Sequence, residues 1–79
     1  MIALDLYNDA LTLTPSDTAN LPRPTDAIWV GGAGIVVAVL ANGRTVNFTC
    51  VAGSLLPLRV TRVNATSTTA TLLNALYQT

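Results

Sequence analysis

Apolar and polar residues alternate in short runs along this chain. Residues 10–14 read Ala-Leu-Thr-Leu-Thr, and residues 44–50 also alternate, which is the period of two typical of a half-buried β-strand. Residues 26–30 and 35–41 are more continuously apolar, as strands buried on both faces are. Residues 56–63 place Leu and Val on one side and Arg and Thr on the other. The pattern therefore predicts a chain built mainly of short strands.

Prolines and glycines separate these runs. Three prolines between residues 15 and 25 exclude regular structure there, so this segment is expected to be an ordered loop or an extended crossing. Gly31-Gly32-Ala33-Gly34 is expected to end the strand that precedes it. Residues 72–77 fit a strand or one and a half helical turns, and the all-β context favours the strand. About five or six strands with regular turns predict a small antiparallel β-sandwich or barrel.

The clearest local signal is a hairpin around Asn42-Gly43. This dipeptide between two strand-like runs predicts a two-residue type I′ turn, which would place Ala41 opposite Arg44 and Ile35 opposite Cys50. One face of the hairpin would then be wholly apolar and face the core. The opposite face would be semi-apolar and is predicted to make subunit contacts; its residues are Val36, Ala38, Leu40, Thr45, Asn47 and Thr49.

Composition supports assembly with other chains. The chain has 79 residues, of which 51% are hydrophobic and only 10% are charged, against about a quarter charged in typical soluble domains. A single small core leaves stability marginal, and the lone Cys50 cannot form an internal disulfide. Oligomerisation is the remaining common way to stabilise so small a chain. We expect one β domain over residues 1–79, with residues 1–9 as a docking arm or a short first strand.

Charge argues against nucleic-acid and membrane partners. Four Arg balance four Asp, and Lys, Glu and His are absent. Scattered arginines do not supply the clustered cations that displace phosphate counterions or bind an anionic membrane surface. The longest near-apolar run, residues 27–41, is shorter than the ~20 residues a spanning helix needs. The first residues lack the basic start of a signal peptide, so synthesis in the cytoplasm with a reduced Cys50 is expected.

Residue types also argue against an enzyme. Without His, Lys, Glu or a second Cys, most catalytic and metal-binding arrangements cannot be built, and no cofactor is expected. Asp17 and Asp26 could form a carboxylate pair, although turn formation is the commoner role of Asp beside prolines. Trp29 is predicted to be either a core residue or an interface anchor. Arg59 and Arg62 lie three positions apart, so a regular strand would send them to opposite faces. One would be solvated and the other held in an ion pair with another subunit, and a plain surface role is the alternative for either.

The order of the motifs resembles the spike base proteins of gene transfer agents and related tailed phages or prophages. The resemblance covers roughly residues 12–77, and Ser67 and Trp29 stand where Gly and Tyr are expected. It rests on Thr14-Pro15-Ser16-Asp17, Leu21-Pro22, Ile28-Trp29-Val30-Gly31-Gly32-Ala33-Gly34, Gly53, Leu56-Pro57-Leu58-Arg59-Val60, Arg62-Val63, Ala65-Thr66, Thr68-Thr69-Ala70-Thr71 and Leu76-Tyr77.

The resemblance implies a virion structural protein that forms a homo-oligomeric base, a pentamer or trimer, at a capsid vertex. Its partners would be the major capsid protein and a spike or fibre protein. The alternatives are a capsid decoration protein, a tail or baseplate component, or a receptor- or glycan-binding module. The predicted oligomer contacts also include Trp29, Arg59 and Arg62. Residues expected to grip the capsid or fibre are Leu4, Leu6, Tyr7, Pro15, Ser16, Asp17, Leu21 and Pro22.

Overall fold

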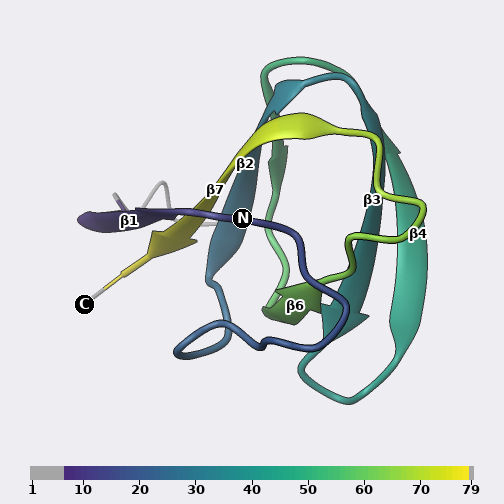
Figure 1. Ribbon diagram of the computed structural model, residues 1–79. Coiled ribbons are helices and arrows are strands. Elements are labelled where there is room, and N and C mark those ends of the chain that lie inside the picture. Colours follow the sequence, from purple (N-terminus) through teal and green to yellow (C-terminus); the bar gives the residue numbers. More distant parts are fainter. Residues whose placement is uncertain (1–6, 79) are drawn as a thin grey trace.

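Two antiparallel sheets face each other in this computed structural model, which describes residues 7–78 (Figure 1). The described part contains seven strands and no helix, so no helix there could span a membrane. The predicted all-β fold is confirmed. The strands are β1 Asp9–Thr12, β2 Ala27–Gly32, β3 Gly34–Leu40, β4 Thr45–Cys50, β5 Ser54–Leu56, β6 Val60–Val63 and β7 Thr71–Tyr77.

The four-stranded sheet has the order β1-β7-β2-β5, and the three-stranded sheet has the order β4-β3-β6. Residues 72–77, which fit a strand or a helix by periodicity, lie in β7 between β1 and β2. Gly31 and Gly32 belong to β2, so only Ala33 separates this strand from β3 in the other sheet. The break predicted over residues 31–34 is therefore much shorter than expected.

The core lies between the sheets and combines side chains from both. Ile28 and Val30 of β2, Val36 of β3, and Val60 and Val63 of β6 are fully or almost fully buried. Burying a side chain of this size contributes about 1.5–3 kcal/mol. Tight packing of branched residues thus holds the two sheets together.

The hairpin of β3 and β4 is confirmed, but its register differs by one residue from the prediction. Ala38 lies opposite Val46 and Val36 opposite Phe48. The Gly43 N–H donates to the Leu40 carbonyl at 2.8 Å, and Gly43 has a φ of 90°, whereas Asn42 does not have a positive φ. This is a three-residue loop, a type I turn with a following glycine bulge. A type I′ turn would need positive φ at both central residues.

The register change exchanges the two faces of the hairpin. Val36 and Ala38 are 0% exposed, so the prediction that these two residues make subunit contacts is wrong. Leu40 is partly buried against the core, and its contact with another subunit stays a prediction. Thr45, Asn47 and Thr49 do lie exposed on the outer face. The outer-face neighbours of these three polar residues on β3 are Ile35, Val37 and Val39.

The run from Leu56 to Val63 forms two strands in different sheets, where one strand was expected. β5 pairs with β2, and β6 pairs with β3. Pro57 stands at the break, and a proline cannot donate to a sheet ladder. The chain therefore changes sheets at this corner.

Hydroxyl side chains extend the ladder of β3 beyond β6. Thr68 Oγ1 accepts from the Val37 N–H at 3.0 Å, and Thr69 Oγ1 accepts from the Ile35 N–H at 2.8 Å. In return the Thr69 N–H donates to the Ile35 carbonyl. This explains the threonine-rich segment before β7: its side chains take the place of a paired strand.

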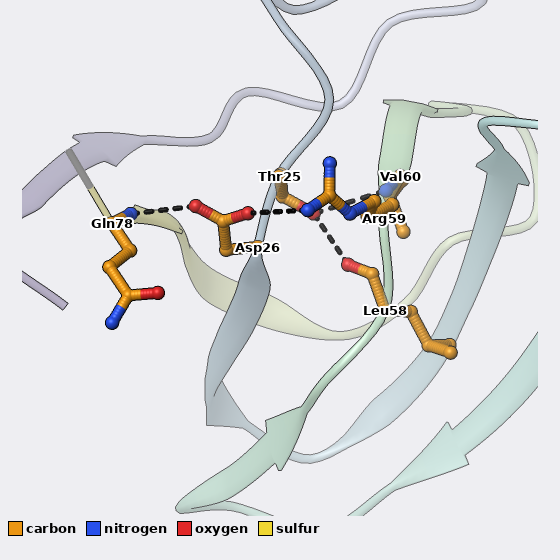
Figure 2. A network of polar contacts seen from close by, with 6 residues as sticks. All are labelled: Thr25, Asp26, Leu58, Arg59, Val60 and Gln78. Atoms are coloured by element: carbon orange, nitrogen blue, oxygen red, sulfur yellow. Dashed lines mark hydrogen bonds and ion pairs between the residues drawn. The ribbon is translucent and has the colours of Figure 1, made fainter. Parts of the chain in front are cut away.

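Thr25 fixes the end of the proline-rich segment against β6 (Figure 2). Its buried hydroxyl donates to the Leu58 carbonyl at 2.8 Å and accepts from the Val60 N–H at 3.1 Å. The Thr25 N–H donates to the Val60 carbonyl. A buried hydroxyl must be hydrogen-bonded to be tolerated, and here it also orients the loop that leads into β2.

Candidate interaction surfaces

An apolar patch lies on the outer face of the four-stranded sheet. Trp29 of β2 is 42% exposed and is paired with Leu55 of β5, which is 44% exposed. On the other side of β2, Leu72 of β7 approaches Gly31, and it is 75% exposed. We name Trp29, Leu55 and Leu72 the outer patch. Of the two readings of Trp29, the structure excludes a buried core position.

Leu72 stands in an unfavourable backbone conformation. Its φ is 55°, a left-handed value that costs a residue with a Cβ about 1–2 kcal/mol. The register of β2 and β7 contains Val30–Leu73 and Gly32–Thr71, the pairs on either side of Leu72, but no Gly31–Leu72 pair. A strained residue that exposes a large apolar side chain does not serve the stability of the isolated chain. Strain of this kind is often kept where a residue has a function, which makes Leu72 a candidate contact residue.

Replacing Leu72 by Asn should stabilise the isolated chain by about 0.5–1 kcal/mol, because Asn tolerates the left-handed conformation. The same change should weaken binding at the outer patch. Chemical denaturation measures the first effect, and co-sedimentation with particles measures the second. Leu55→Asn, which removes a patch leucine from ordinary strand geometry, is the control and should weaken binding without stabilising the fold. A Leu72→Asn chain that binds as well as the unchanged one would exclude Leu72 from the contact.

The sequence reasoning missed Leu55 and Leu72. The signal for Leu72 was present, because a strand over 72–77 that buries Leu73, Ala75 and Tyr77 must turn Leu72 outward. Leu55 could not be found in this way, since its strand has three residues and too short a pattern.

Both arginines predicted to contact other subunits have partners within the chain. Arg59 Nη2 lies 3.7 Å from Asp26 Oδ1 (Figure 2), with the arginine side chain 73% exposed. Such exposed pairs contribute little to stability. Arg62 donates to Asn64 through Nε and to Asn20 through Nη1. Arg62 thus ties the proline-rich segment to the end of β6, while a role for either residue between subunits stays a prediction.

The proline-rich segment is bound to its own domain. Ser16 Oγ accepts from the Thr18 and Ala19 N–H groups, and the Leu21 N–H donates to the Thr61 carbonyl. Pro15 and Leu21 are half-buried, and Pro22 is exposed. Among the predicted docking residues, Tyr7 is half-buried, whereas Leu4 and Leu6 lie outside the described residues.

Asp17 joins this segment to the loop before β7. Its Oδ1 accepts from the Thr66 N–H at 3.0 Å, and its Oδ2 accepts from the Thr66 hydroxyl at 2.7 Å. Hydrogen bonds from the Thr66 backbone and then from its side chain lower the pKa of Asp17 below its ordinary value. The carboxylate therefore stabilises the fold at neutral pH, and this contribution is lost as pH falls through the lowered pKa.

The two carboxylates considered as a catalytic pair serve separate contacts. Asp17 binds Thr66, whereas Asp26 accepts from the Gln78 N–H at 2.6 Å and faces Arg59. Residues 7–78 contain no cluster of three potential metal ligands and no pocket. The candidate sites in this part of the chain are therefore exposed apolar side chains and free strand edges, both of which can bind other proteins.

These features define the class: a small β-sandwich whose outer surface is suited to protein contacts. A chain in a solved structure described as "Capsid of native GTA particle computed with C5 symmetry" matches it with 36% identity and a TM-score of 0.84. The match covers 96% of this chain and 90% of that one. No protein-family model and no curated protein matches. The chain therefore belongs to the family of this capsid-particle protein and is a virion structural protein of the gene transfer agent and phage type.

Proposed function

We propose that the chain is a homo-oligomeric base that attaches a spike or fibre to a vertex of a phage-like capsid. The observation that carries the proposal is the match, over almost the whole of both chains, to a component of a capsid particle described with fivefold symmetry. The partners would be the major capsid protein and a spike or fibre protein. The role is structural and needs no catalysis.

The outer patch supports such a role. Trp29, Leu55 and Leu72 present large apolar side chains to solvent, and residues of this kind form the centres of protein interfaces. In a ring, each subunit repeats one contact with its neighbour, so a modest surface is used many times. The outer patch and the other exposed surfaces would then be available to the capsid below and the fibre above.

Stoichiometry tests the proposal against its alternatives. We expect about five copies at each occupied capsid vertex of purified particles, as a cyclic vertex ring requires, with copies counted by quantitative mass spectrometry. Particles from a producer that lacks the gene should keep complete shells and lose their spikes. Copies distributed over the whole shell would instead identify a decoration protein, and copies on the tail a baseplate component.

A further inference from the structure

β4 presents an open strand edge. In the antiparallel hairpin, Leu40 and Arg44 form a hydrogen-bonded pair through the Leu40 N–H and the Arg44 carbonyl. Because hydrogen-bonded pairs alternate, the main-chain groups of Thr45, Asn47 and Thr49 point away from β3. No described strand pairs with β4 on that side. Three residues therefore offer N–H and C=O groups to an incoming strand.

The other edges are covered or short. The proline-rich segment lies along β6, where Ser16 and Leu21 donate main-chain hydrogen bonds to Val63 and Thr61. β1 and β5, the two edges of the other sheet, have four and three residues, and β5 ends before Pro57. β4 has six residues and lacks the proline, lysine or bulge with which proteins usually protect an edge. It is the longest open edge in the described part of the chain.

The core side of this edge is incompletely covered. Val46 and Phe48 point inward from β4 but are only half-buried. A fourth strand beside β4 that carried apolar residues on its inner face would cover both side chains. Polar residues would suit its outer face, next to Thr45, Asn47 and Thr49.

The segment before β1 has that pattern. Ile2, Leu4 and Leu6 occupy alternate positions, and Ala3 and Asp5 lie between them. In an extended strand the three large apolar residues would share one face. The segment also carries an acidic residue, whereas Arg44, at the start of the open edge, forms no salt bridge with a described residue.

We propose that residues 2–7 of one copy add as a strand to the β4 edge of a second copy. The proposal deepens the homo-oligomeric base proposed above and depends on it. β1 and β4 lie on opposite sides of the molecule (Figure 1), which measures 32 × 24 × 22 Å. Six residues reach at most about 20 Å, and pairing with β4 uses that whole length. The arm therefore cannot also cross its own domain, so the acceptor is another copy.

Donor and acceptor at opposite sides make the contact heterologous, and repetition of such a contact closes a ring when the rotation allows it. Strand addition supplies main-chain hydrogen bonds without demanding a particular side chain at each position. It would also make each subunit complete the core of the next. The outer patch stays free to bind capsid or fibre in this arrangement.

Disulfide trapping tests the contact in the full chain. With Cys50 replaced by Ala, Ala3→Cys is combined in turn with Thr45→Cys, Asn47→Cys or Thr49→Cys. One combination should give a ladder of covalent oligomers beyond the dimer on a non-reducing gel. The control combines Ala3→Cys with a cysteine at Thr71, an exposed residue of the other sheet, and should stay monomeric.

Each other outcome overturns the proposal. An internal disulfide would show that the arm binds its own chain, and dimers alone would show reciprocal exchange. If no β4 cysteine reacts above the control while native mass spectrometry still finds oligomers, the arm contact is wrong and the homo-oligomeric base survives. If no oligomers form on particles either, both fail.

A proline at the edge provides a second measurement. Asn47→Pro removes an outward N–H and blocks pairing, whereas Asn47→Ala keeps the N–H. We expect Asn47→Pro to weaken self-association at least about tenfold, as loss of one to two hydrogen bonds implies, and Asn47→Ala to leave it unchanged. Equal association of the two variants would overturn the proposal.

Discussion

Particles that carry Trp29→Glu in place of the natural residue should retain less than about one hundredth of the normal amount of this protein. Central aromatic residues commonly contribute more than about 2 kcal/mol to an interface, and about 2.8 kcal/mol corresponds to a hundredfold loss of affinity. Trp29 lies at the middle of the outer patch and is 42% exposed. A carboxylate there would have to be buried without a partner, which adds to the lost contact.

Ile35→Glu is the matched control for this experiment. Ile35 is similarly exposed, at 36%, but lies in the three-stranded sheet on the other side of the sandwich. Quantitative mass spectrometry of purified particles gives the retention of each variant, and thermal unfolding of the free proteins shows that both still fold. Equal retention of the two variants would remove the outer patch from the assembly contact.

The strands were largely predictable because each one produces a recognisable pattern of apolar and polar residues within a short stretch of sequence. The alternation in residues 44–50 and the Asn42-Gly43 turn locate a hairpin without any tertiary information. Register is a finer property, and one residue more in the loop changes it. Asn42 does not have a positive φ, so the loop is one residue longer than predicted. Val36 and Ala38, which were expected at the surface, therefore lie in the core.

The two sheets were less predictable because contacts far apart in sequence decide them. Nothing in the alternation of residues 56–63 shows that β5 and β6 belong to different sheets, apart from Pro57. Similarly, the hydroxyls of Thr68 and Thr69 lie in what reads as a loop. They complete the ladder of β3 only because the chain brings them beside it.

Predicting the candidate surfaces required knowing which face of each strand is exposed, and this was predicted correctly for only some of the residues. Trp29 was expected as a core residue or an anchor, and its exposure leaves the second role. Thr45, Asn47 and Thr49 were placed outside correctly although their partners on β3 were not. Their importance lies in main-chain groups at an open edge, which side-chain patterns do not reveal.

Gly34→Ala should destabilise the chain by about 2–6 kcal/mol. Gly34 has a φ of 152° where β2 passes into β3, and a Cβ on it would lie 2.5 Å from the Ala70 nitrogen and 2.7 Å from the Thr69 carbonyl carbon. Strain at such a φ costs about 1–3 kcal/mol, and forced displacement of packed atoms costs about 1–3 kcal/mol more. Neither obstacle is a flexible side chain, and both belong to the segment that hydrogen-bonds to Ile35.

Gly43→Ala separates the two causes, because Gly43 also has a positive φ, of 90°, but a Cβ there meets nothing within 4 Å. It should cost only about 1 kcal/mol, measured for both variants by urea denaturation. If the two substitutions cost the same, the segment at Thr69 and Ala70 moves aside easily. The hydrogen bonds from Thr68 and Thr69 to β3 would then not hold this segment rigidly. The junction between β2 and β3 would not depend on the close approach of the chain at Gly34.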